Sequence, residues 1–100
     1  MKIAFFEIQG WEKHILKRAL KKHSLTFFKE PLTDENIEKA KNAEVISVFI
    51  YSKINKKVID NLKKTKLIAT RSTGFDHIDI KECIKRKMIV ANVPSYGENT

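Results

Sequence analysis

Five short apolar runs, separated by longer segments with a polar face, are the feature that most constrains the fold of this chain. The run EVISVFI at 44–50 is almost continuously apolar and β-branched, which is typical of a strand covered on both faces of a parallel sheet. The five expected strands occupy residues 2–7, 24–29, 44–50, 66–70 and 88–93. Pro94 stops the last of them.

Apolar residues at helical spacing fill two of the intervals between these runs. Within residues 10–23 one stripe contains Trp11, Ile15 and Ala19, with Leu16 and Leu20 beside it and with Lys and Glu on the opposite face. Residues 55–65 repeat the spacing at Val58, Ile59 and Leu62. Both segments are therefore predicted to form amphipathic helices.

Two further helix starts are marked by polar residues that bind free backbone N–H groups. After the chain break at Pro31, the signal is the run Thr33, Asp34 and Glu35. Later, Asp79 and Glu82 have the spacing of a capping box, with Asp in place of the usual Ser or Thr. The helix that follows is predicted to turn three residues inward, Ile80, Cys83 and Ile84.

Alternating strands and helices indicate a parallel sheet with helices on both sides. One hundred residues suffice for one domain, and five such strands predict a flavodoxin-like, doubly wound, three-layer α/β/α domain. The polar ending PSYGENT has no closing helix, although such a sheet needs one to cover a face. We therefore expect residues 1–100 to be an incomplete domain.

Composition narrows the possible partners and the compartment. The net charge is +8, but the basic residues are mostly dispersed Lys and only three are Arg, so we expect no nucleic-acid binding. No apolar run approaches the roughly 18 residues of a membrane span, and the start lacks a signal-peptide pattern. A single cysteine, Cys83, fits a reducing compartment. These features predict a cytoplasmic protein with no membrane partner.

Polar residues are concentrated in TRSTGFDHIDI, which follows the fourth expected strand. In doubly wound sheets, ligands bind beyond the carboxyl ends of the strands, where this loop meets those after the third and fifth strands. Gly74 lacks a Cβ, so it can adopt positive φ and allow a ligand close to the backbone. Successive backbone N–H groups in such a turn form an anion-binding site, and a carboxylate is the expected ligand.

The strings LIATRSTGFDHIDI, KECIKRKMIV and ANVPSYGENT together resemble the substrate-domain signature of the NAD-dependent D-2-hydroxyacid dehydrogenases, and especially the D-lactate dehydrogenase-like members. The resemblance is detailed over 67–100 and only architectural before that, apart from FIYSKI. It implies that the backbone of Thr73 and Gly74 binds the carboxylate of a small 2-hydroxy or 2-oxo acid, and that Tyr51 and Tyr96 line the cleft.

The same resemblance places the rest of the chemistry outside these residues. In that family the catalytic Arg, Glu and His lie in a Rossmann domain that binds NAD, and the enzyme is a homodimer. The three glycines here do not form a G-x-G-x-x-G fingerprint, so no catalytic or cofactor-binding residue is assigned in 1–100. The motif does not distinguish NAD from NADP, nor one 2-oxo acid from another. We expect the hundred residues alone to be inactive.

Several residues that could take part in catalysis or binding have ordinary structural interpretations. His77 is expected to bond locally, and Arg71 to hold the loop by pairing with Asp76 or Asp79. Asp79 is interpreted as a helix cap and Cys83 as a small buried hydrophobe. The remaining histidines lack Cys or acidic partners at ligand spacing, so no metal site is predicted.

Three other functions share this fold class. A signalling receiver needs an acidic cluster after the first strand, an Asp after the third and a Lys after the fifth. At these places the chain has Glu7, Ile50–Tyr51 and Pro94–Tyr96, so the Asp and the Lys are missing. A flavin carrier needs a phosphate-binding loop after the first strand, and FEIQGWE is a poor one. A non-catalytic binding module, such as a corepressor relative of the dehydrogenases, stays open because the deciding residues lie outside this sequence.

Overall fold

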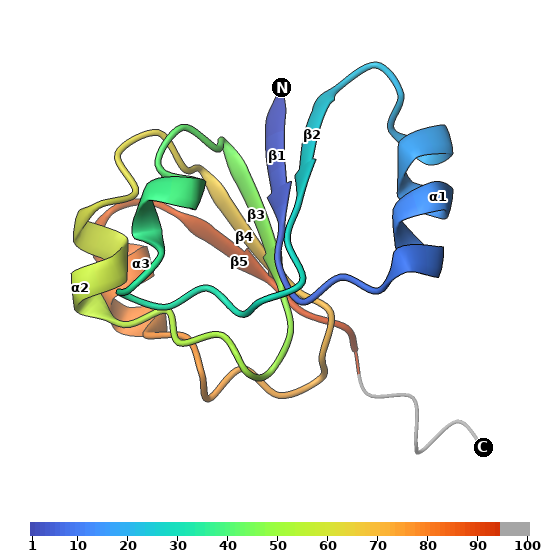
Figure 1. The fold of residues 1–100 in the computed structure, drawn as a ribbon. Helices are drawn as coiled ribbons and strands as arrows, with labels where there is room; N and C mark the ends of the chain where they lie inside the picture. Colours follow the sequence, from blue (N-terminus) through green and yellow to red (C-terminus); the bar gives the residue numbers. More distant parts are fainter. Residues whose placement is uncertain (95–100) are drawn as a thin grey trace.

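A computed structural model describes residues 1–94, which form one sheet of five parallel strands with helices on both faces (Figure 1). The strands are β1 (Lys2–Phe5), β2 (Ser24–Phe27), β3 (Val45–Val48), β4 (Leu67–Thr70) and β5 (Ile89–Ala91). The helices are α1 (Gly10–Ala19), the 3-10 helix η1 (Ile37–Ala40), α2 (Lys56–Asp60) and α3 (Ile80–Lys85). All five predicted strands are confirmed, each shorter than its apolar run.

The strand order is β2-β1-β3-β4-β5, and every neighbouring pair is parallel. This is the flavodoxin-like order, so the predicted fold class is confirmed. The order reverses at β1, between β2 and β3. Because all strands run the same way, the loops that follow β1, β3, β4 and β5 lie along one edge of the sheet.

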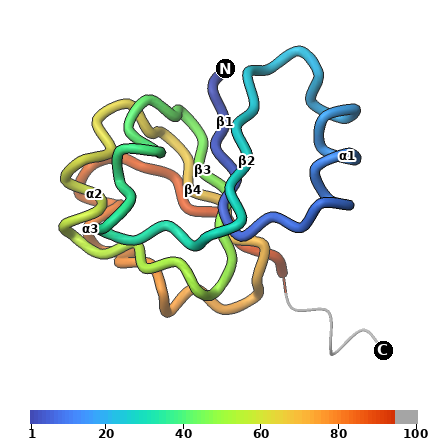
Figure 2. Tube along the Cα trace, viewed as in Figure 1, coloured from blue at the N-terminus to red at the C-terminus, as the bar shows by residue number. Residues whose placement is uncertain are grey.

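The two faces of the sheet are covered unequally. Figures 1 and 2 show η1, α2 and α3 together on one face and α1 alone on the other, beside β1 and β2. The larger core lies under α2 and α3 and includes the fully buried Ile46, Ile59 and Ile68. The smaller core lies under α1 and contains Ile3 and Phe5.

The exposure of one row of aligned strand residues shows how much of this face of the sheet α1 covers. Ile3, Val45, Leu67 and Ile89 stand in register on neighbouring strands. Ile3 is 9% exposed beneath α1, whereas Ile89 on β5 is 66% exposed. Among the described residues, therefore, no helix covers the β5 side of this face.

The buried stripe of α1 differs from the predicted one. Trp11 and Ile15 are 67% and 59% exposed, so the stripe assigned to them is wrong. Leu16 and Leu20 pack against the small core, and Glu12 lies on the same stripe, four residues before Leu16. Glu12 was predicted on the outer face, but its side chain is only 23% exposed, and its carboxylate lies 4.0 Å from the guanidinium of Arg71, the residue that follows β4.

The segment after Pro31 forms only the four-residue 3-10 helix η1, although an ordinary helix start was predicted there. The side chain of Asn36 accepts from the Thr33 amide at 2.9 Å and donates to the Pro31 carbonyl at 2.9 Å. These local bonds occupy backbone groups that a longer helix would use. The connection from β2 to β3 is therefore mostly a loop.

The start of α3 is as predicted, and its inward face is predicted correctly at Ile80 and Cys83 but not at Ile84. The Asp79 side chain accepts from the Glu82 amide at 3.1 Å, which confirms the N-cap. Cys83 is fully buried, while Ile84 is 68% exposed and was wrongly placed inward. The chain turns back at Lys87, whose φ is 60°, so the inward side continues from Cys83 to Met88 rather than through Ile84.

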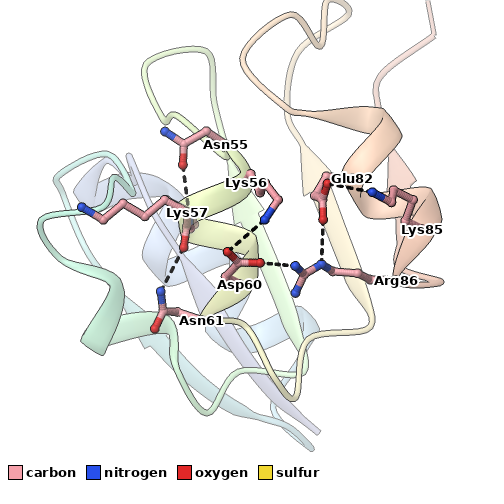
Figure 3. A network of polar contacts seen from close by, with 9 residues as sticks. Asn55, Lys56, Lys57, Asp60, Asn61, Glu82, Lys85 and Arg86 are labelled. Carbon is pink, nitrogen blue, oxygen red and sulfur yellow. Dashed lines mark hydrogen bonds and ion pairs between the residues drawn. The ribbon is translucent and has the colours of Figure 1, made fainter.

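Charged residues join α2 to α3 instead of completing the predicted capping box (Figure 3). Glu82 accepts from Arg86 Nε at 3.1 Å, and the same guanidinium donates to Asp60 on α2. Burial acts to raise the pKa of Asp60, but the positive charges of Arg86 and Lys56 outweigh it and hold that pKa below its ordinary value. The pairs are partly exposed, so they orient the two helices more than they stabilise them.

Candidate substrate-binding site

An open hollow lies at the carboxyl edge of the sheet, with a volume of about 360 Å³. One wall is Phe49–Ile50 after β3, and the other is residues 71–74 after β4, with Val93 after β5 beside it. The sequence predicted that these three loops meet, and the structure brings them together. Among residues 1–94 no cluster of three metal-ligating side chains is present, and no helix has the length and apolarity to cross a bilayer.

The turn at residues 72–74 is tethered through its carbonyl groups. The Ser72 carbonyl accepts from the Val93 amide at 2.9 Å, and the Thr73 carbonyl accepts from Asn92 Nδ2 at 2.7 Å. The Gly74 carbonyl accepts from Ser72 Oγ at 2.8 Å. Within the described residues, the amides of Thr73 and Gly74 donate to no protein acceptor. Sequence reasoning missed the tethers from Asn92 and Val93 because they come from a different strand end.

Neither the backbone angle of Gly74 nor a close neighbouring atom requires glycine at this position. Its φ is not positive, so the turn does not use the positive φ that a glycine can adopt. A Cβ built on Gly74 would have no atom of another residue within 4 Å. The side of Gly74 where a side chain would project is therefore open space next to the hollow.

Arg71 ties the start of this loop to β1 and β3, although it was expected to pair with Asp76 or Asp79. Its guanidinium donates to the carbonyls of Phe6 and Glu7 at 2.7 and 2.9 Å and to Ser47 Oγ at 2.8 Å. Burial lowers the pKa of Arg71 from its ordinary value, against the opposing charges of Glu12 and Glu7, but an arginine stays charged at any physiological pH. The structural role is confirmed and the predicted partners are wrong.

Glu7 is a residue of this region to which the sequence analysis gave no role in substrate binding. Its carboxylate accepts from the backbone amides of Phe49, Tyr51 and Ser52, at 2.9 to 3.1 Å. The available signal was an acidic residue directly after the first strand, at the edge where ligands bind. Its partners lie more than 40 residues away, and spacing along the chain does not reveal them.

Tyr51 follows Phe49 and Ile50 along the chain but does not line the hollow, and its side chain is 69% exposed. Its ring contacts Phe49 edge to face, with centroids 6.4 Å apart. Tyr96, the second predicted cleft tyrosine, lies outside the described residues. Cys83 is buried, and burial raises the pKa of its thiol, which fits the predicted role as a small hydrophobe.

His77 bonds locally, as predicted, through a chain of hydroxyl groups. Its Nε2 lies 2.9 Å from Thr70 Oγ1, which lies 2.6 Å from Ser72 Oγ. Ser72 uses its single hydrogen for the Gly74 carbonyl, so Thr70 donates to Ser72 and accepts from His77. Neutral His77 therefore carries its proton on Nε2.

This arrangement predicts a pH-dependent contribution to stability. Burial lowers the pKa of His77 below its ordinary 6.5, with the charges of Glu7 and Asp76 opposing the effect. The unfolded chain then takes up a proton before the folded one, so the contribution is present above pH 6.5 and declines as pH falls further. In urea unfolding, the stability difference between wild type and His77→Asn should shrink from pH 7.5 to pH 5.5. A constant or growing difference would contradict this prediction.

Comparison with known proteins identifies this architecture. A family model described as "D-isomer specific 2-hydroxyacid dehydrogenase, catalytic domain" matches residues 3–100. The chain is 33% identical to a D-2-hydroxyacid dehydrogenase (NAD(+)) of Clostridioides difficile, over 99% of this chain and 32% of that protein.

Two solved structures agree closely with the fold. Apo D-lactate dehydrogenase of Escherichia coli superposes with a TM-score of 0.86 at 27% identity, over 97% of this chain and 32% of that one. D-lactate dehydrogenase of Aquifex aeolicus, complexed with NAD and lactic acid, also gives 0.86, at 33% identity, over 95% of this chain and 28% of that one. The chain thus spans about a third of the length of these relatives. By the match of residues 3–100, it belongs to the D-isomer specific 2-hydroxyacid dehydrogenase family.

Proposed function

We propose that residues 1–100 are the first part of the substrate domain of an NAD-dependent oxidoreductase that interconverts a D-2-hydroxy acid and a 2-oxo acid, such as D-lactate and pyruvate. Family membership and the share of each relative that is matched support this proposal. In the complete enzyme, these residues are joined to a nucleotide-binding domain. We propose that the complete enzyme is a homodimer, because the family that it resembles is dimeric. We also propose that it is cytoplasmic, because the single cysteine, Cys83, is buried and unpaired, which fits a reducing compartment.

The observation that carries the proposal is the turn at 72–74. Its three carbonyls are held by protein donors, and the amides of Thr73 and Gly74 donate to no described acceptor beside the hollow. Two adjacent N–H groups fixed in this way suit a carboxylate, which accepts several hydrogen bonds and carries the charge that makes them strong. The neutral end of a 2-oxo acid would then extend toward Phe49, Ile50 and Tyr51.

The role that we propose for this chain is to bind the substrate and to orient it. Holding the carboxylate at Thr73 and Gly74 fixes the direction of the adjacent carbonyl carbon, and Tyr51 and Tyr96 would line the cleft around it. NAD, held by the nucleotide-binding domain, would supply or accept the hydride. The sequence of residues 1–100 contains no glycine fingerprint, so we assign no cofactor contact to these residues.

Carboxylate binding is tested by titrating the 15N-labelled hundred-residue chain with pyruvate and, separately, with pyruvamide. Pyruvamide has nearly the same shape but no negative charge. Pyruvate should shift the amide resonances of Thr73 and Gly74 more than any others, and pyruvamide should shift them little. Equal shifts from both compounds, or none at Thr73 and Gly74, would rule out the proposed carboxylate site.

A second expectation follows from the proposal that this chain binds the acid while the catalytic groups lie in the nucleotide-binding domain. The hundred-residue chain should oxidise no NADH in the presence of pyruvate, whereas the complete enzyme should do so. Absorbance at 340 nm measures both reactions. Turnover by the pure chain would refute the proposal that the catalytic groups lie elsewhere. A complete protein that binds the acid without oxidising NADH would instead be the non-catalytic binding module.

A further inference from the structure

We infer that Glu7 is a positioning residue for the substrate, because it connects both walls of the hollow and fixes their separation. The inference rests on the proposed function and extends it to a residue after β1 that does not line the hollow. Glu7 meets the first wall through its side chain and the second through its backbone. One residue therefore couples two loops, residues 49–52 and 71–74, that follow different strands.

The carboxylate of Glu7 determines the path of residues 49–52. Oε2 accepts from the amides of Phe49 and Ser52, at 3.0 and 2.9 Å, and from the hydroxyl of Ser52. Oε1 accepts from the amide of Tyr51 at 3.1 Å. Ser52 is fully buried, and its hydroxyl also accepts from the Leu32 amide at 2.9 Å. Three amides of one short loop thus converge on a single carboxylate, which sets the place where Tyr51 leaves the sheet edge.

The backbone of Glu7 holds the opposite wall. Its carbonyl accepts from the guanidinium of Arg71 at 2.9 Å, and Arg71 is the residue just before the turn at 72–74. Its amide donates to the Glu30 carbonyl at 3.1 Å. Glu7 has a φ of 61°, a left-handed conformation that costs free energy for any residue with a Cβ. This conformation lets the carbonyl and the side chain of one residue serve different loops.

Glutamine at position 7 is a sharp test because it keeps the size of the side chain and removes one acceptor. If the Gln oxygen takes the place of Oε2, it can still accept from Phe49 and Ser52. Its NH2 group then faces the Tyr51 amide, and two donors repel each other. Glu7→Gln should therefore release Tyr51 selectively while leaving the fold in place.

In the complete enzyme, Glu7→Gln should raise the KM for the 2-oxo acid about tenfold, because a small misplacement of a substrate wall weakens binding by such factors. The kcat should stay within about threefold, and the KM for NADH should not change. Glu44→Gln is the matched control. Glu44 also accepts a backbone amide, that of Lys2 at 3.0 Å, but at the opposite edge of the sheet. Its KM values should equal those of wild type.

Hydrogen exchange in the hundred-residue chain gives an independent measurement. The Tyr51 amide should exchange at least about tenfold faster in Glu7→Gln than in wild type or Glu44→Gln, while amides of the β3 core keep their protection. Unchanged exchange at Tyr51, or a loss of protection throughout the chain, would overturn the inference. So would a wild-type KM in an active Glu7→Gln enzyme, an outcome that leaves the proposed function intact. An inactive wild-type enzyme would instead reject the proposed function, and the inference with it.

Discussion

Replacing Gly74 by Val in the complete enzyme should raise the KM for the 2-oxo acid by at least about tenfold, with little loss of stability. The φ of Gly74 lies outside the left-handed region, and a Cβ there would contact no other residue, so the backbone can accept a side chain. The added methyl groups would project into the space where a carboxylate must approach the Thr73 and Gly74 amides. The substitution should therefore obstruct binding without disturbing the turn.

Gly10→Val is the matched control, because a Cβ on Gly10 also has no neighbour within 4 Å and the site lies at the start of α1. Steady-state kinetics with the 2-oxo acid, together with urea unfolding of each variant, separates the two effects. An unchanged KM in an active Gly74→Val enzyme would count against the carboxylate role of this turn. A large loss of stability would mean that the turn needs glycine for its own folding.

Replacing Arg71 by Met is expected to lower the free energy of unfolding by about 2–4 kcal/mol, because hydrogen bonds from a charged group are among the stronger ones and their acceptors are left unsatisfied. The acceptors are the carbonyls of Phe6 and Glu7 and the Ser47 hydroxyl, which join three neighbouring strands at one edge. Lysine at position 71 should recover only part of the loss, since one ammonium group cannot reach three separate acceptors in the same way.

Arg18→Met serves as the control, because Arg18 is exposed on α1, and its removal should change stability by less than about 0.5 kcal/mol. Urea unfolding followed by circular dichroism measures all three variants. Arg71→Met should also raise the KM for the 2-oxo acid, because the turn at 72–74 begins at this residue. Equal stabilities for the Arg71 and Arg18 variants would show that the bonds to the strand ends contribute little.

The fold was predictable because each strand and most helices carry a local signal. Continuous β-branched runs such as 44–50 indicate buried parallel strands whatever the rest of the chain does. The stripe of α1 was misassigned because Trp11 and Ile15 have the same four-residue spacing as Leu16 and Leu20. Which of two apolar stripes becomes buried depends on where the sheet lies, and periodicity does not specify that.

The candidate site was predictable in place but not in its construction. The parallel topology alone brings the loops after β3, β4 and β5 to one edge. The residues that hold those loops, Glu7, Arg71 and Asn92, act across long sequence distances through backbone carbonyls and amides. Every residue other than proline has both groups, so composition and motif spacing do not predict which backbone carbonyls and amides are paired. Asp76 and Asp79 looked like better partners for Arg71 only because they are close in sequence.

The most direct test of the central claim is a crystal structure of the complete enzyme with oxamate, an unreactive analogue of pyruvate, in the cleft. We expect the oxamate carboxylate to lie within about 3 Å of the amide nitrogens of both Thr73 and Gly74, the distance of an ordinary N–H···O hydrogen bond. A carboxylate held elsewhere, with these two amides turned away from the ligand, would contradict it.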